Sequence, residues 1–363
     1  MEIQSAIFIA ATVLIGMTIW EARRSQQSEA ARTVFLRLWG LVLIAFVGYV
    51  LLSYLTALSM VTQDPTAAER FGTYGEVQRR GLFALGLAGA AAVWLWLLVF
   101  DVRFRRPLLR LFPRPQPSVT SEPDHVPRPW VRGFDPHSPV HALALALALL
   151  FFLQSVIDYI LAGGQSGLAA TDLSQTGLVI SAALTALMLL VSAFAGVGVG
   201  QDRSWKAAIE RLGLHRVGFT EITVGAGVAV MLLVFQFSAA IVWMLFVPQN
   251  VIEQQTELSR AITGSVTSLT AAFLVASFSS LGEEIAFRGA LQPVLGLWPT
   301  AVLFALTHIQ YQFTPAALII FVVGLVLGWT RHYFGTVAAI AAHFLYNFSL
   351  LTLAIFASRF VGG

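Results

Sequence analysis

The sequence contains no cysteine and few charged residues, and both shortages restrict what the protein can be. Without cysteine there is no disulfide, no thiolate nucleophile and no thiolate metal site. Charged residues make up only 11% of the 363 residues, whereas soluble domains carry about 25%. Hydrophobic residues make up 57% and the mean hydropathy is +0.77. This composition indicates a polytopic membrane protein.

Lysine is almost absent as well, because Lys206 is the only one and the positive charge comes from arginines in loops. The formal net charge is only +3, which gives no support for nucleic-acid binding. Since cytoplasmic loops carry an excess of basic residues, the arginines instead predict the orientation of the helices. With the basic loops inside, both termini lie outside. These loops contain Arg23 and Arg24, Arg103 to Arg132, Arg203 to Arg216, and Arg331.

Long apolar runs predict an all-α fold, a polytopic transmembrane bundle of about ten helices, because a helix crosses a bilayer with ~20 residues. Only helices and closed barrels satisfy the backbone in lipid, and runs of this length exclude the barrel. The first run is interpreted as an anchor helix and not a cleaved signal peptide, since no basic residue precedes it. The predicted spans are Ser5–Trp20, 36–60, 81–101, 140–163, 176–200, 219–246, 266–288, a short one at 298–312, 315–331 and 336–356.

The segment Gly282–Gly289 is the most informative part of the sequence, because two adjacent glutamates and an arginine interrupt an apolar run there. Ionisable groups at membrane depth are costly, so their presence indicates a functional site. On a helix, Glu284 and Arg288 are four residues apart and can pair. Glu283 is rotated by about 100° from Glu284 and has no such partner. We therefore expect Glu284 to be held in place and Glu283 to be free for chemistry, near the cytoplasmic end of the helix.

Two further pairs of residues accompany these carboxylates in later spans. Of the seven histidines, only His308 and His343 fall within apolar runs. His308 follows Phe304 by four residues and Asn347 follows His343 by four, so each pair shares one face of a helix. Such polar groups could simply hold helices together. Their clustering in one part of the chain favours a site.

The types of residue suit hydrolysis of an amide bond inside the membrane. A glutamate and a histidine can together deprotonate water, and a second histidine with an asparagine can donate to a developing oxyanion. Serine catalysis is disfavoured because Ser279 and Ser280 have no Gly-x-Ser-x-Gly setting. The His-Glu-x-x-His signature of zinc proteases is absent. Glu283, His308 and His343 could nevertheless bind a catalytic Zn²⁺, and the sequence does not separate the two mechanisms.

In order and spacing, these three motifs resemble those of the CAAX prenyl endopeptidase and bacteriocin-processing family of intramembrane proteases, abbreviated CPBP or Abi. The resemblance covers about residues 265–356, and Phe287 and Gly289 also fit it. It implies a site that opens toward the cytoplasm and a membrane-associated peptide or prenylated protein as substrate. It also implies these roles: water activation by Glu283 and His308, support of Glu284 by Arg288, and oxyanion stabilisation by His343 and Asn347, or metal ligation by His343.

The chain is accordingly predicted to have two regions. Residues 1–218 would form amino-terminal membrane helices of unassigned function, with a proline-rich cytoplasmic loop at about 105–139 and a short amphipathic segment at 203–218. Residues 219–363 would form the protease domain, with its catalytic core in the last four helices and a loop at 247–264. The expected location is the cell membrane, with lipid as a partner. The alternative is a non-proteolytic immunity, scaffold or transporter-like membrane protein that uses the same polar residues for packing.

Overall fold

The computed structural model describes residues 2–361 except 64–67, 69–70, 114–132, 165–173, 215–216 and 309–315. Most of the predicted proline-rich loop therefore lies outside the described residues. The described part is helical and contains nine helical segments long and apolar enough to cross a membrane. The prediction of an all-α polytopic bundle is confirmed, and the chain is an integral membrane protein.

The membrane helices follow the predicted spans closely. The exception is the short span predicted at 298–312, which corresponds to α14 (Leu297–Leu306) and is too short to cross a bilayer in the described structure. The nine long segments are α1 (Glu2–Arg24), α2 (Glu29–Gln63), α4 (Tyr74–Phe100), α6 (Pro139–Ala162), α8 (Gln175–Val197), α10 (Phe219–Phe246), the continuous run Leu269–Leu295, α15 (Ala316–Phe334) and α16 (Thr336–Val361).

Several helix ends are encoded locally by serine and glycine. The hydroxyl oxygens of Ser174 and Ser268 accept hydrogen bonds from the third residue of α8 and of the Leu269–Leu295 run, which satisfies backbone donors at these starts. Gly163 and Gly198 end α6 and α8 with φ of 86° and 84°, a left-handed conformation that glycine adopts without strain. These signals define the loops between the membrane spans.

Short helices lie between the spans and include one that the sequence analysis missed. They are α5 (Val102–Arg105), η1 (Arg106–Arg110), α9 (Trp205–Leu212) and α11 (Gln249–Gly264). Helix α9 matches the predicted amphipathic segment, and Ala208 and Leu212 are its buried residues. The segment 247–264 was expected to be a loop, and this was wrong. Its many glutamine and glutamate residues favour a helix, and no proline interrupts it after Pro248.

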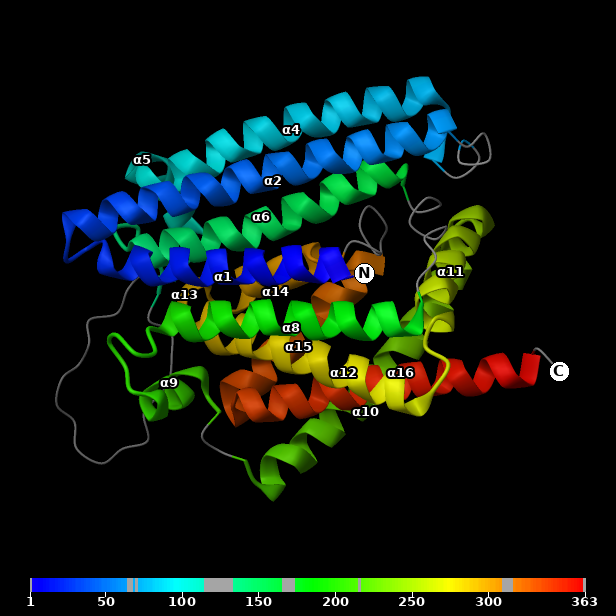
Figure 1. Ribbon diagram of the computed structural model, residues 1–363. Helices are drawn as coiled ribbons and strands as arrows, with labels where there is room; N and C mark the ends of the chain where they lie inside the picture. Colours follow the sequence, from blue (N-terminus) through cyan, green and yellow to red (C-terminus); the bar gives the residue numbers. More distant parts are fainter. Residues whose placement is uncertain are drawn as a thin grey trace.

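The helices form one bundle in which α2 packs on α4, α4 on α6, α8 on α12 and α10 on α16 (Figure 1). Helices α2, α4 and α6 lie along one side, α1 and α8 run through the middle, and α10 and α16 lie on the other side. One hydrophobic core contains Trp39 of α2, Leu143 of α6 and Phe304 of α14. Packing is thus continuous across residue 218, and the predicted division into two regions there stays a prediction.

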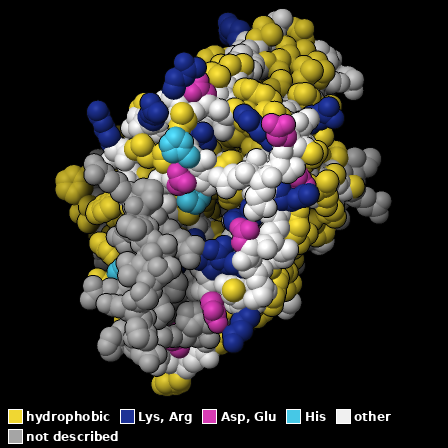
Figure 2. Space-filling view, turned by 90° about the vertical axis from the view of Figure 1, so that its left-hand side faces the viewer, with side chains coloured by type: hydrophobic (Ala, Val, Ile, Leu, Met, Phe, Trp, Pro, Cys, Tyr) yellow, Lys and Arg dark blue, Asp and Glu magenta, His cyan; other side chains and the backbone are white. Residues whose placement is uncertain are grey.

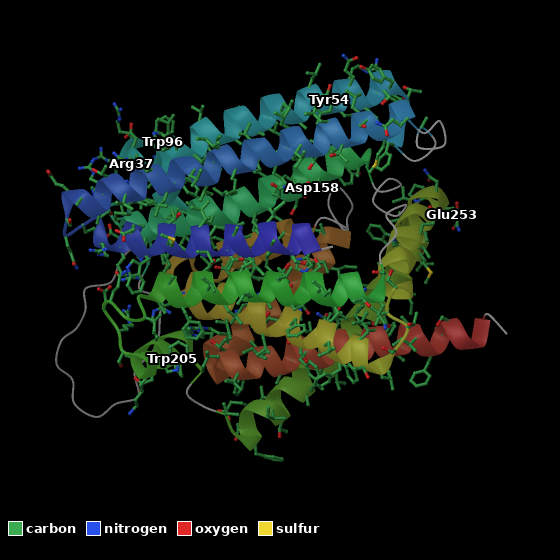
Figure 3. All side chains as sticks on the ribbon, viewed as in Figure 1. Arg37, Tyr54, Trp96, Asp158, Trp205 and Glu253 are labelled. Carbon is green, nitrogen blue, oxygen red and sulfur yellow. The ribbon has the colours of Figure 1, made fainter. Side chains whose placement is uncertain are left out.

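Arginines gather at one end of this bundle, which we call the arginine-rich end. Helix α1 ends there with Arg23 and Arg24, and α4 is followed there by Arg103. Figure 2 looks at this end and shows Lys and Arg side chains spread over its surface, with His, Asp and Glu among them. Figure 3 places Arg37, Trp96 and Trp205 toward the same end and Glu253 at the opposite one.

Candidate active site

The helical run that carries the two glutamates changes its winding at the site. It begins as α12 (Leu269–Glu283), continues as the π-helix η2 (Glu284–Leu291) and ends as α13 (Gln292–Leu295). Wide π turns are rare and frequently mark functional sites. The predicted span stopped at residue 288, whereas the helix continues to Leu295. The carboxylates therefore lie near the middle of the span, and the expectation that they lie near its end was wrong.

A proline gives a local reason for the π-helix. Pro293 has no N–H to donate to the carbonyl of Gly289, four residues earlier, and its ring would clash with that carbonyl in an α-helix. The Gly289 oxygen instead accepts a hydrogen bond of 2.9 Å from Nη1 of Arg211, in α9. A Cβ at Gly289 would lie 3.0 Å from the Leu212 carbonyl oxygen, so glycine permits this close approach of α9.

Glu284 is completely buried and makes two polar contacts. Its Oε2 lies 3.1 Å from Nε of Arg288, and its Oε1 lies 2.8 Å from Nδ1 of His343 on α16. The predicted Glu284–Arg288 pair is therefore present. Because the carboxylate beside Arg288 is an acceptor, His343 donates through Nδ1, which leaves a lone pair on Nε2 of the neutral ring. The pair and the histidine join the π-helix to α16.

Arg288 makes two further contacts. It donates from Nη2 to the carbonyl oxygen of Gly324 on α15, 3.2 Å away. Its guanidinium carbon lies 4.1 Å from the ring centroid of Phe304, a cation–π contact. One turn later, Gln292 donates to the carbonyl of Gly328 at 2.9 Å. The two glycines of the Gly-x-x-x-Gly face thus offer backbone carbonyls to two donors spaced four residues apart.

Glu283, by contrast, is partly open and lies beside His308. The side chains of both residues are 21% exposed, and the distance from Oε2 of Glu283 to Nε2 of His308 is 3.9 Å. Among the described residues, Oε2 of Glu283 has no hydrogen-bond partner. A distance of 3.9 Å is too long for a direct hydrogen bond but suits a water that bonds to both groups.

The tautomer of His308 is set by the backbone. Its Nδ1 lies 2.7 Å from the carbonyl oxygen of Phe304, which can only accept, so Nδ1 carries the proton. In the neutral ring the lone pair is then on Nε2, the nitrogen that faces Glu283. The Phe304 ring also contacts both histidines, with centroid distances of 4.6 Å to His308 and 6.0 Å to His343. Phe304 thus positions the two imidazoles with its backbone and its ring.

Asn347 lies one helical turn from His343 and contacts a different part of α12. Its Nδ2 donates to the hydroxyl of Ser279 at 3.3 Å, and Ser279 lies one turn before Glu283. The Ser279 hydroxyl donates in turn to the carbonyls of Val275 and Ala276. This serine is engaged as a structural link, in agreement with the inference against serine catalysis.

The structure thus brings together the predicted site residues in linked groups. Sequence reasoning missed Gln292 and Ser279 as partners, although their spacing of four residues from Arg288 and Glu283 was a usable signal. Glu283, His308 and His343 were the possible zinc ligands. In the described part of the chain, no three histidine or carboxylate side chains form a group that could hold a metal ion. The roles proposed for these residues therefore need no metal.

Comparison with known proteins bears on this same segment. Residues 265–349 match the family model described as type II CAAX prenyl endopeptidase Rce1-like. The chain therefore carries an Rce1-like domain at its carboxy-terminal end, and the resemblance to the CPBP family is confirmed over these residues. The match supports CAAX-type intramembrane protease activity as the class of function.

One curated relative also matches a short part of the chain. Over 71 residues, 18% of this chain, the sequence is 35% identical to the uncharacterized protein YpbD of Bacillus subtilis (strain 168). The match spans 36% of that relative, which is much less than two thirds of its length. No solved structure matches the chain.

Proposed function

We propose that the protein is an intramembrane endopeptidase in which Glu283 and His308 activate a water molecule. The observation that carries this proposal is the 3.9 Å separation between Oε2 of Glu283 and Nε2 of His308. Oε2 has no hydrogen-bond partner among the described residues, and the Phe304 carbonyl leaves the lone pair of His308 on Nε2. Geometry of this kind suits general base catalysis. Both side chains are partly exposed, whereas the neighbouring Glu284 is completely buried, and Oε2 of Glu283 is itself a buried oxygen.

The reaction follows from the placement of these groups. Glu283 takes a proton from the water, and the water oxygen attacks the carbonyl carbon of the peptide bond. When the tetrahedral intermediate collapses, the C–N bond breaks and the proton passes to the leaving nitrogen. The products are a new carboxylate and a new amine. Asn347 can donate a hydrogen bond to the oxyanion through its neutral side-chain amide. His343 uses its Nδ1 proton for Glu284, so it can donate through Nε2 only when the ring is doubly protonated.

The remaining residues are positioning residues in this scheme. Glu284 and Arg288 form a buried pair that fixes the π-helix against α15 and α16, one residue from the proposed base. The description of the matching family names a prenyl endopeptidase, and this suggests the kind of substrate. We therefore propose a membrane-associated or lipid-modified peptide as substrate, with a cytoplasmic-facing site in the cell membrane.

The test is peptide cleavage by the purified, detergent-solubilised full chain. The substrates are a farnesylated CAAX peptide, the same peptide without its prenyl group, and a transmembrane peptide. Glu283→Gln and His308→Gln are each expected to lower the cleavage rate by about 10²–10⁴-fold, the usual contribution of a general base. Asp158→Asn is the matched control, since Asp158 is also an intramembrane carboxyl but only accepts hydrogen bonds from Tyr49 and Gln154.

Two results would contradict the proposal. Cleavage by Glu283→Gln at the wild-type rate would show that Glu283 is not the base that activates the water. Activity that a chelator abolishes and zinc restores would contradict the metal-free scheme.

A further inference from the structure

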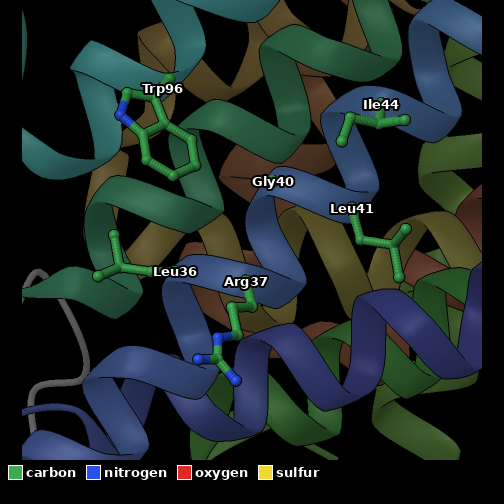
Figure 4. Close-up of a pocket in the computed structure, with 6 residues that line it drawn as sticks. All are labelled: Leu36, Arg37, Gly40, Leu41, Ile44 and Trp96. Carbon is green, nitrogen blue, oxygen red and sulfur yellow. The ribbon is translucent and has the colours of Figure 1, made fainter.

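A groove on the outside of the amino-terminal helices has no part in the proposed reaction. It lies between α2 and α4 and has a volume of about 490 Å³. Figure 4 shows the residues around it, with Trp96 contributed by α4 and the others by α2. The lining is apolar except for one arginine. The lining residues are Leu36, Arg37, Gly40, Leu41, Ile44 and Trp96.

The groove lies at the depth where a lipid head group meets the acyl chains. No charged residue follows Arg37 in α2 from Leu38 to Gln63, a stretch longer than the ~20 residues that cross a bilayer. Arg37 therefore marks the edge of the hydrocarbon region. Trp96 lies five residues before Asp101, the first charged residue after the apolar run of α4. Tryptophan is enriched at this interfacial level.

Arg37 is a free cation in this position. It is exposed, and within the described residues it has no ion pair or hydrogen bond. Two other arginines at the same end are paired. Arg23 bonds to Asp202, and Arg103 bonds to both oxygens of Asp101 and holds the pKa of that carboxyl below its ordinary value. The apolar groove thus has one unpaired positive charge at its edge.

Gly40 is what opens the groove. A Cβ at this position would lie 3.5 Å from the Trp96 ring, so any larger side chain would fill the space beside the tryptophan. On α2, Leu41 and Ile44 lie beyond Arg37 toward the hydrocarbon region and are 50% and 69% exposed. The apolar path therefore begins at the arginine and continues into the membrane.

We propose that this groove binds one anionic glycerophospholipid, with its phosphate on Arg37 and an acyl chain along Gly40, Leu41 and Ile44 against Trp96. The charge selects an anionic head group. A transmembrane helix of a second copy would place its own apolar surface against Arg37 and leave the cation unpaired. The site is separate from the carboxylates and histidines of the proposed active site.

Native mass spectrometry of the full chain tests this site with two lipids that share the same acyl chains. The protein in non-denaturing detergent is titrated with dioleoyl phosphatidylglycerol, which is anionic, and dioleoyl phosphatidylcholine, which is zwitterionic. The wild type should bind one phosphatidylglycerol more tightly than phosphatidylcholine. Arg37→Gln should lower the affinity for the first bound phosphatidylglycerol by about five-fold. Gly40→Leu, which fills the acyl path, should weaken both lipids.

Two matched controls separate the site from general effects. Arg32→Gln removes another exposed arginine of α2 outside the groove, and Gly48→Leu adds the same side chain where nothing lies within 4 Å. Both variants should bind the two lipids with the same affinities as the wild type. The proposal is overturned if Arg37→Gln leaves phosphatidylglycerol binding unchanged, or if the wild type does not distinguish the two lipids. A dimer that Gly40→Leu dissociates would also overturn it, because a second copy would then occupy the groove.

Discussion

The carboxylate of Glu284 is fully buried and contacts Arg288 and His343, whereas that of Glu283 is partly exposed and faces His308 across 3.9 Å. The Glu284–Arg288 pair was predictable because it needs only helical spacing. The pairing of Glu284 with His343 was not, because it joins two helices 59 residues apart in the sequence. The same limit applies to Phe304, whose carbonyl sets the tautomer of His308.

The buried ion pair leads to a prediction about stability. Arg288→Met should lower the free energy of unfolding by about 3–5 kcal/mol, because it leaves the Glu284 carboxylate buried without its cation. The double variant Glu284→Gln with Arg288→Met should recover a large part of that loss, since no isolated charge is left. Unfolding in a titration with denaturing detergent measures both. A double variant less stable than Arg288→Met alone would contradict this account.

At the scale of helices, the π-helix and its neighbour α15 decide how the site is presented. A regular α-helix was predicted through residue 288, because hydrophobic pattern does not reveal a wide turn. Pro293 was the signal for the wide turn, because it has no N–H to donate to the carbonyl of Gly289. The Gly-x-x-x-Gly face of Gly324 and Gly328 allows a close contact with the neighbouring helices. Its second role, as a pair of backbone acceptors, depends on how α15 is placed.

Gly328 gives a direct test of this close contact. A Cβ there would lie 2.4 Å from Leu297 and 3.1 Å from the Gln292 amide oxygen, so Gly328→Leu should push α15 away from the π-helix. The expected loss of stability is about 1–3 kcal/mol, as for other overpacked interiors, and cleavage should fall with it. Gly86→Leu in α4, where nothing lies within 4 Å, is the control. Equal behaviour of the two variants in the same detergent titration would contradict the prediction.

At the scale of the whole molecule, hydropathy predicted the order of the membrane helices, and their number to within one, but not which helices are neighbours. In lipid both the buried and the outward faces of a helix are apolar, so the pattern does not show which face is covered. The contact of α8 with α12 is an example. A Cβ on Gly282 would lie 2.7 Å from the Cα of Ala186, which brings α8 directly against the residue before Glu283. Helix α11 was missed because its polar residues resemble a loop.

This packing predicts that the carboxy-terminal region depends on the helices before it. A fragment of residues 219–363 lacks α8 and should expose the face of α12 that carries Gly282, so it should be less stable than the full chain. Size-exclusion profiles and unfolding titrations of both proteins in the same detergent measure the difference. A monodisperse fragment as stable as the full chain would show that residues 1–218 give this domain no support.

The central claim is that two neighbouring glutamates have different tasks, and comparing Glu283→Gln with Glu284→Gln tests it most directly. Cleavage rate and unfolding midpoint are measured for both variants beside the wild type, on the substrate that the wild type cleaves best. Glu283→Gln should lose cleavage and keep the wild-type midpoint. Glu284→Gln should lower the midpoint, because it leaves Arg288 buried without a counter-charge. Wild-type cleavage by Glu283→Gln would contradict the account.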